Sequence, residues 1–239
     1  SKDKIMSKLK SGFTLAEVLI TLGIIGIVAA MTIPTIMQKI TKRKLETQIK
    51  AAYSTIAQTM RSVEADDSGF DMKIATDEGQ DSTNNWFKSY ILPYLKTENV
   101  CYNKPGCWHK KGTVKDLQGN PSPWDYDAGL GNYIVTFITA KGTYFNIDGM
   151  NVYRMNTLFG IKTDSIGLVF YFDANGDRKP NVIGKDVYVM AYTDKGLVPA
   201  GADKTPEEVE QNCFNGNGYW CLAYLKNNGW EISDKVWKR

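Results

Sequence analysis

A single carboxylate, Glu17, interrupts an apolar stretch that runs from Phe13 to Met37 and holds no other ionisable side chain. As a helix of about 25 residues, this stretch would be roughly 37 Å long, more than the ~30 Å hydrocarbon core of a bilayer. A lone carboxylate is costly in such surroundings and usually marks a partner of opposite charge. Glu17 is therefore the first residue that we expect to have a function.

Four cysteines form two close pairs in the sequence, Cys101 with Cys107 and Cys213 with Cys221. An even number of cysteines in local pairs is typical of disulfides in an oxidising compartment, and free thiols are the alternative. Neither pair has C-x-x-C spacing, and the one histidine, His109, cannot complete a Cys/His zinc set. We expect two local disulfides, and we expect His109 at the surface because no acid or base lies near it in the sequence.

The stretch DANGDRKPN, residues 173–181, invites a calcium interpretation because Asp173, Asn175 and Asp177 alternate as oxygen donors. It departs from the EF-hand pattern, which needs a glycine at the sixth place and an acid at the twelfth, since Gly176 is fourth and Gly184 is twelfth. A hairpin turn through Asn175 and Gly176 is the simpler interpretation. Calcium is the weak alternative, and we expect no other metal or cofactor.

The charge of the chain is concentrated at its beginning. Residues 1–12 account for the whole net charge of +3, so the chain from Phe13 onward sums to zero. A protein that binds phosphates normally keeps a positive excess, so we expect no direct contact with nucleic acid.

The sequence also lacks a nucleophile elbow, a P-loop and a dinucleotide fingerprint, which argues against an enzyme.

The apolar stretch continues into a helical pattern of another kind. After Pro34, apolar residues recur at spacings of three to five, as an amphipathic helix requires: Ile36, Ile40, Leu45, Ile49, Ala52, Tyr53, Ile56, Met60 and Val63. The pattern predicts one helix of about 52 residues that ends near Glu64–Ser68, with a bend or local melting at Pro34. Its first half must find partners outside its own chain.

The remaining residues favour a sheet. Residues 132–148 read as two strands joined by a turn at Lys141-Gly142, and residues 165–199 supply two longer strands and a short third. We expect an antiparallel sheet of four or five strands with one face on the amphipathic half of the helix. Short helices are expected at Asn85–Leu95 and Tyr219–Asn227, and the Trp and Tyr residues of 219–237 are expected to serve as core and subunit contacts, with a sugar platform as the alternative.

The fold class is therefore α+β, a long N-terminal helix packed on a C-terminal antiparallel sheet. We divide the chain into a leader (1–12), a transmembrane or filament-core helix (13–37), an amphipathic half of the helix (38–66), a connecting region with a short helix and the Cys101/Cys107 loop (67–131), and a sheet with a disulfide-closed C-terminal segment (132–239).

Residues 12–34, GFTLAEVLITLGIIGIVAAMTIP, resemble the N-terminal cleavage and methylation motif of type IV prepilins and type II secretion pseudopilins. The resemblance combines a basic leader, Gly12 followed by Phe13, Glu17 at the fifth position after Gly12, and Pro34 at the twenty-second. It is close over about the first 50 residues. The loop that begins at Asp173 also resembles one that is common among bacterial pilin-like proteins.

The resemblance implies that prepilin peptidase cleaves between Gly12 and Phe13 and methylates the new amine of Phe13. It implies that Glu17 then pairs with that amine on a neighbouring subunit, and that Pro34 acts in assembly. The expected partners are the peptidase, copies of this chain and other pilins in a helical filament, an inner-membrane assembly platform, and the inner membrane before assembly. The globular domain is expected in the periplasm, and the filament in the periplasm or outside the cell.

Two other functions stay open. A minor pilin at a filament tip could use the Trp- and Tyr-rich C-terminal region for adhesion or ligand binding. A membrane-anchored secreted module would carry the N-terminal motif by coincidence.

Overall fold

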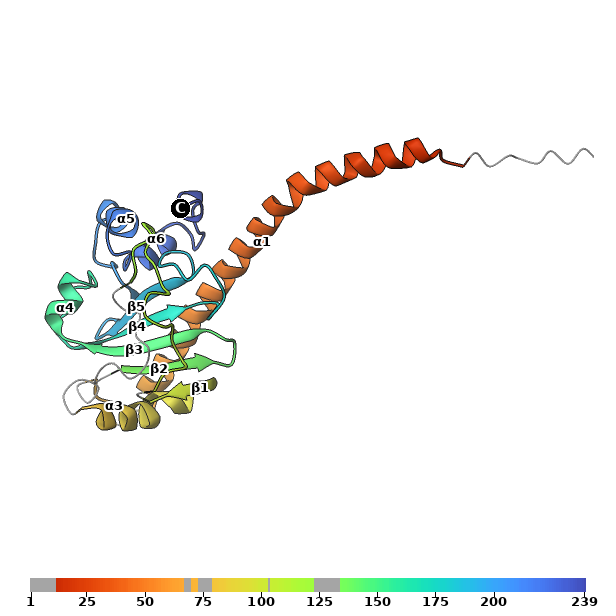
Figure 1. Ribbon diagram of the computed structural model, residues 1–239. Helices are drawn as coiled ribbons and strands as arrows, with labels where there is room; N and C mark the ends of the chain where they lie inside the picture. Colours follow the sequence, from red (N-terminus) through yellow and green to blue (C-terminus); the bar gives the residue numbers. More distant parts are fainter. Residues whose placement is uncertain (1–11, 67–69, 73–78, 103, 123–133) are drawn as a thin grey trace, which may run out of the picture. The chain divides into compact units, whose positions relative to one another are not determined.

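The computed structural model of this chain describes residues 12–66, 70–72, 79–102, 104–122 and 134–239 (Figure 1). The chain divides into two units, residues 1–41 and 42–239. Its helices are α1 (Leu15–Ala65), α3 (Gln80–Trp86) with a π-helical turn (Phe87–Ile91) and a 3-10 turn (Leu92–Tyr94), α4 (Val152–Thr157), α5 (Pro206–Asn215), α6 (Cys221–Asn227) and α7 (Asp234–Trp237). Its strands are β1 (Thr97–Cys101), β2 (Ile134–Thr139), β3 (Tyr144–Met150), β4 (Gly167–Asp173), β5 (Val187–Thr193) and β6 (Gly196–Pro199).

Helix α1 has 51 residues and ends at Ala65, which confirms the long helix that the sequence predicts. We expected a bend or local melting at Pro34; the helix passes through this residue without a break, so it does not melt there. A proline removes one backbone donor. The rest of the helical hydrogen-bond ladder suffices to keep the segment helical.

The six strands form one antiparallel sheet in which the spatial order follows the sequence, β1-β2-β3-β4-β5-β6. The predicted turn between β2 and β3 is present, and Gly142 adopts a φ of +76° there, which suits a residue without a Cβ. The sheet has six strands, not the four or five expected. The additional strand is β1, which lies in the region that we took as irregular. Its exposed residues are polar, so its pattern of apolar residues is weak. Its partner β2 begins more than 30 residues later, so no short hairpin pattern marks the pair.

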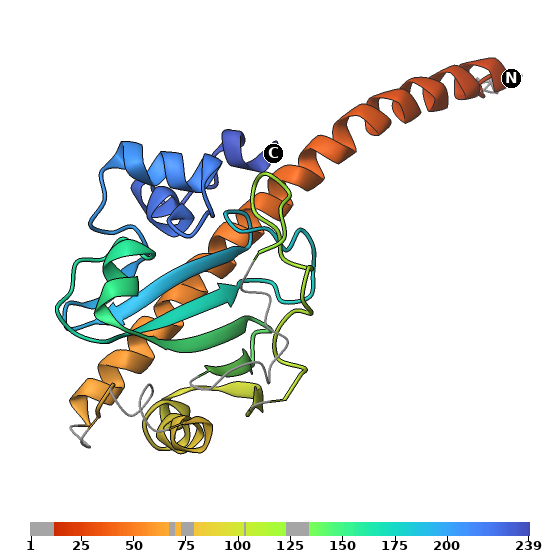
Figure 2. The same ribbon diagram turned by 60° about the vertical axis from the view of Figure 1, so that its left-hand side comes forward.

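The second half of α1 packs on one face of this sheet, as Figure 2 shows for the orange part of the helix. Leu45, Ile49, Ile56 and Met60 have at most 2% of their surface exposed. They share a core with inward residues of the strands: Val135, Phe137, Phe145, Ile147, Leu168, Phe170, Phe172, Tyr188, Met190 and Tyr192. Because burial of each large apolar side chain contributes about 1.5–3 kcal/mol, this helix face is a main source of the stability of residues 42–239.

The central strands β4 and β5 are buried along their whole length, since a second core covers their other face. That core includes Phe159, Val189 and Tyr219. A strand buried on both faces has a continuous apolar sequence rather than an alternating one, which explains GLVFYFD and VYVMAYT.

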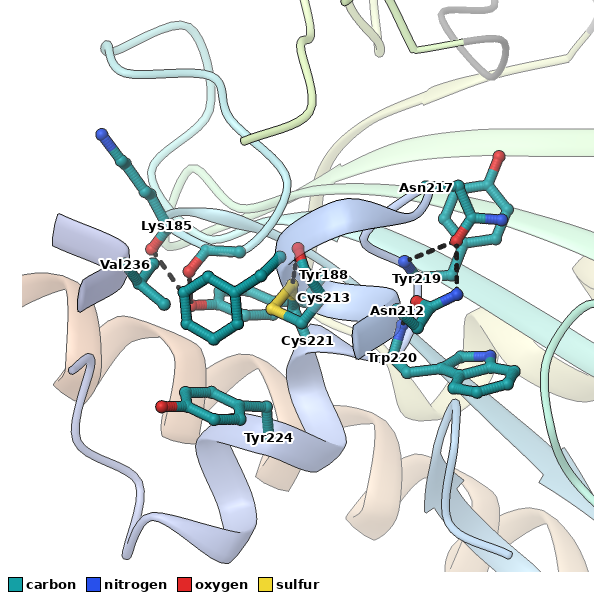
Figure 3. Close-up of a disulfide and its surroundings, with 12 residues drawn as sticks. Lys185, Tyr188, Asn212, Cys213, Asn217, Tyr219, Trp220, Cys221, Tyr224 and Val236 are labelled. Carbon is teal, nitrogen blue, oxygen red and sulfur yellow. Dashed lines mark hydrogen bonds between the residues drawn. A yellow bond between two sulfur atoms is a disulfide. The ribbon is translucent and has the colours of Figure 1, made fainter. Parts of the chain in front are cut away.

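The C-terminal region consists of α5, α6 and α7. We predicted α6 from the sequence and missed α5, although TPEE at residues 205–208 is a capping box with proline at the first helical position. In Figure 3 the Cys213–Cys221 disulfide joins α5 to α6, and the Asn217 side chain accepts hydrogen bonds from Asn212 Nδ2 and the backbone of Tyr219, both at 3.1 Å.

The aromatic residues of this region contribute to the core, as we expected, and the sugar platform stays an untested alternative. Tyr219 is 1% exposed, and Trp230 is half-buried with its ring 5.3 Å from that of Tyr53 on α1. The backbone N–H of Ile232 donates to Glu46 Oε1 at 2.9 Å, and Lys42 pairs with Asp234 at 3.0 Å.

Candidate functional site

The N-terminal unit exposes nearly all of its apolar side chains. Of the described large apolar residues with exposed side chains, every one except Tyr153 lies between Phe13 and Ile40. Among the described residues, α1 is the one helix long and apolar enough to cross a membrane, by length and composition. Exposed apolar surface of this extent marks a segment that is covered by lipid or by other protein chains.

Glu17 is held at the first turn of α1 by a reciprocal capping box. The backbone N–H and the hydroxyl of Thr14 donate to Glu17 Oε2 at 2.7 and 2.9 Å, and the N–H of Glu17 donates to Thr14 Oγ1 at 3.2 Å. Such a cap satisfies two backbone donors that a helix start leaves free and contributes about 1 kcal/mol. The carboxylate that looked alone in the sequence therefore has a local partner within its own chain.

Two hydroxyl groups in the apolar half of α1, those of Thr21 and Thr32, are also satisfied. Thr21 donates to the carbonyl of Glu17 at 2.9 Å, and Thr32 donates to the carbonyl of Val28 at 2.9 Å. In hydrocarbon an unsatisfied donor is costly, whereas a threonine that bonds back to its own helix is tolerated. Glu17 is thus the one charged side chain of residues 12–37. The other polar side chains of residues 15–33 are Thr21 and Thr32, and both are hydrogen-bonded.

The predicted cleavage site lies at the edge of the described residues. Phe13 is 88% exposed, and a Cβ placed on Gly12 would meet no atom within 4 Å. Leader residues 1–11 lie outside the described part of the chain. Gly12 and Phe13 are therefore exposed residues that precede the helix.

Both disulfides have the expected connectivity. Cys101 is joined to Cys107 and Cys213 to Cys221, with Cα–Cα distances of 5.8 and 4.7 Å. The first closes the loop that follows β1, and the second fixes α6 on α5.

His109 is buried, which corrects our expectation of a surface residue. It is 3% exposed, and its Nε2 atom lies 2.9 Å from Oδ2 of Asp173, a fully buried residue at the end of β4. Its Nδ1 atom is 3.9 Å from Asp177, which also accepts a hydrogen bond from Tyr144 at 2.8 Å. Burial raises the pKa of the Asp173 carboxyl, and the hydrogen bond with His109 opposes that shift.

The connection between β4 and β5 is longer than the hairpin turn that we expected. Gly176 adopts a φ of +66° in a turn, but the connection covers residues 174–186. Asp186, fully buried at its end, accepts the backbone N–H groups of Asn181 and Val182 at 2.9 and 2.7 Å. Side-chain carboxylates that satisfy loop backbone in this way stabilise long turns. Burial, with the negative charge of Asp173, raises the pKa of Asp186 to about 8.

Two of the three oxygen donors that suggested calcium, Asp173 and Asp177, have protein partners, whereas Oδ1 of Asn175 is buried without a hydrogen-bond partner among the described residues. Asp173 bonds His109 and the backbone N–H of Asn175, and Asp177 bonds Tyr144. Among the described residues, no three His, Cys, Asp or Glu side chains are grouped as a metal site would need. The calcium assignment stays a prediction.

Two features of the site were missed in the sequence. Thr14 and Glu17 form the T-x-x-E signature of a capping box, so the signal for the cap was present. The signal for His109 was not, since its partner Asp173 is 64 residues away.

The comparisons with known proteins agree with the N-terminal part of this description. Residues 7–33 match the family described as "Prokaryotic N-terminal methylation motif", and residues 35–111 match a family of unknown function. No curated protein and no solved structure matches the chain.

The matched motif is consistent with the type IV pilin and pseudopilin family, whose members are structural proteins. Together with the apolar helix, it supports a membrane-anchored pilin or pseudopilin precursor that prepilin peptidase processes.

Proposed function

We propose that this chain is a structural subunit of a filament of the type IV pilus or type II secretion class, not an enzyme. The observation that carries the proposal is the joint occurrence of the methylation motif and an exposed apolar helix with one charged residue, Glu17. Prepilin peptidase cleaves between Gly12 and Phe13 and methylates the new amine. Until assembly, the apolar half of α1 stays in the inner membrane, and residues 42–239 lie in the periplasm.

In this proposal Glu17 is the registry residue of the filament. The ammonium group that cleavage creates on Phe13 of one subunit pairs with the Glu17 carboxylate of the next. Desolvation offsets most of the attraction in such a pair, so its contribution to stability is small. A subunit at the wrong height, however, leaves both charges without a partner, at a cost of several kcal/mol. The pair therefore selects one arrangement of helices.

The capping box allows this pairing to be tested separately from helix capping. Glu17→Gln removes the charge, whereas Thr14→Val removes the hydroxyl of the cap and leaves the carboxylate. We expect the Glu17→Gln precursor to be cleaved normally and to yield at least tenfold less filament, and the Thr14→Val variant to assemble within about threefold of wild type. Filament yield is measured in material sheared from cells. Normal assembly of Glu17→Gln would overturn the registry role.

Processing is tested with Gly12→Leu and by mass spectrometry of the N-terminus. The bulky side chain should leave uncleaved precursor in the membrane and no filament, because glycine has no Cβ to obstruct an extended chain in the protease. The wild-type chain should begin with N-methylated Phe13. An unmethylated, uncleaved wild-type chain would favour a simple membrane anchor and contradict the proposal.

A further inference from the structure

Two loops of residues 42–239 together present an unbalanced group of positive charges. One is the segment 104–115 and the other is the β4–β5 connection. The backbone N–H of Lys115 donates to Asn181 O at 3.1 Å, and the N–H of Ile183 donates to Lys115 O at 2.8 Å. Six exposed cations lie on these joined loops, which we call the basic surface: Lys104, Lys110, Lys111, Lys115, Arg178 and Lys179.

Within the part of the chain that the structure describes, no ion pair neutralises the basic surface. None of its six side chains forms an ion pair with a carboxylate of the described residues. The two solvent-accessible carboxylates nearby already serve local structure. Asp116 accepts hydrogen bonds from Gln118 and Asn120, and Asp177 accepts one from Tyr144.

The opposite charge is concentrated where α1 ends and α3 begins. Residues 64–81 contain seven acidic side chains and one lysine. Four of them are described and exposed, and we call these the acidic end: Glu64, Asp66, Asp71 and Asp81. Local contacts fix the backbone there, since Trp86 Nε1 donates to Asp71 O at 2.9 Å and the Phe70 ring lies 5.8 Å from that of Trp86.

The basic surface and the acidic end lie on different sides of this unit. In Figure 2 the yellow-green loop and the cyan loop lie to the right of the sheet, whereas α1 ends at the lower left. Strand β5 connects the two regions. It begins directly after the β4–β5 connection, and near its other end Tyr192 bonds Glu64 of the acidic end.

We propose that the basic surface of one copy of this chain contacts the acidic end of a second copy. The inference rests on the proposed filament function and specifies how adjacent globular units contact each other. An interface between two different patches of the same protein is heterologous, and where its rotation does not close it generates an open helical array. Complementary charges at such a contact fix register and exclude wrong partners more than they add affinity.

The overall charge favours a second copy over a lipid surface or a nucleic acid. From Phe13 onward the chain sums to zero, so the positive excess on one side is matched by a negative excess elsewhere. An anionic membrane or a nucleic acid would bind the basic surface and be repelled by the acidic end. A second copy of this chain contacts both the basic surface and the acidic end.

The test is a charge reversal on each side and the combination of the two, in full-length chain. The basic variant is Lys110→Glu with Lys111→Glu, and the acidic variant is Asp66→Lys with Asp81→Lys. We expect each variant alone to lower the yield of sheared filament at least tenfold and the combined variant to recover to within about threefold of wild type. The control variant Lys162→Glu with Lys226→Glu makes the same charge change at exposed residues outside both regions and should assemble within about twofold of wild type.

Each result separates this inference from the proposed function. Absence of filament from the wild-type chain would overturn the proposed function itself. If wild type assembles, Glu17→Gln does not and the reversals have no effect, the contact between globular units is wrong and the function stands. If the basic variant fails and the combined variant does not recover, the basic surface binds another anionic partner, such as lipid headgroups, and the inference is overturned. Precursor level in the membrane and resistance of residues 42–239 to limited proteolysis show that each variant is folded.

Discussion

Asp148 is a buried carboxyl that the assembly proposal does not use. It lies on β3 and is 9% exposed, and burial raises its pKa to about 7, although the positive charge of Arg154 acts in the opposite direction. The unfolded chain has an aspartate pKa of about 3.9. Because the folded pKa is the higher one, the folded state holds the proton more tightly. Its contribution to stability is therefore complete below about pH 4 and is lost as the pH rises through about 7.

We expect Asp148→Asn to remove this part of the pH dependence. The amide has the same shape as the protonated acid and does not ionise. Relative to wild type, the free energy of unfolding of the variant should increase between pH 5 and pH 7.5, with an upper limit of about 4 kcal/mol for the full shift. Urea unfolding at both pH values measures this difference. A constant difference between variant and wild type at the two pH values would contradict it.

At the residue scale, the sequence was informative where partners are close along the chain. The two disulfides and the turn at Gly142 are local features, with at most eight residues between the groups that interact, whereas the cap between Thr14 and Glu17 is equally local and was missed. The pair of His109 with Asp173 is a tertiary contact between a loop and the end of strand β4. No local pattern predicts such a contact, so its burial emerged from the structure alone.

At the scale of elements, α1 combines two patterns with different physical causes. Its first half is apolar on all sides, as expected of a helix surrounded by lipid or other helices, and its second half is apolar on one face. Both patterns are long and strongly periodic, and the sequence therefore predicted α1 and the β2–β3 hairpin. Strand β1 is short and polar on its exposed face, and α5 is signalled mainly by its cap, so both were missed.

The packing of α1 on the sheet predicts a large cost for truncating its buried face. Ile56 is fully buried in the core shared with the sheet. Ile56→Ala should lower the free energy of unfolding by about 2–5 kcal/mol, because it removes apolar contacts and leaves a cavity. Gln58→Ala, on the exposed side of the same helix, is the matched control and should change it by less than about 0.5 kcal/mol. Equal effects of the two changes in urea unfolding would show that α1 does not pack on the sheet in this way.

At the scale of the whole molecule, residues 42–239 contain both large cores. All described core residues of the two main clusters lie between Leu45 and Val236, whereas the large exposed apolar side chains, Tyr153 excepted, lie in residues 13–40. The two units thus need different surroundings, one apolar and one aqueous. The composition of the sequence predicted this contrast. It did not predict the residue at which the first unit ends and the second begins, because that residue depends on which turn of α1 first contacts the sheet.

A fragment of residues 42–239 should therefore fold without the apolar helix. We expect a soluble monomer in size-exclusion chromatography and a single cooperative urea transition followed by both circular dichroism and tryptophan fluorescence. The full-length chain should need detergent to stay monomeric, because its exposed apolar helix remains. Aggregation of the fragment, or transitions that differ between the two probes, would show that residues 1–41 contribute to the core.

The short spacing of the two cysteine pairs has a consequence for how the disulfides form. The pairs are 6 and 8 residues apart, whereas Cys107 and Cys213 are separated by 106. In an unfolded chain the probability that two residues meet falls as the three-halves power of their separation, so each native pair meets roughly fifty times more often than the closest mismatched pair. Correct oxidation can therefore precede folding of the sheet, and in an oxidising compartment the chain has little need of an isomerase to repair wrong bonds.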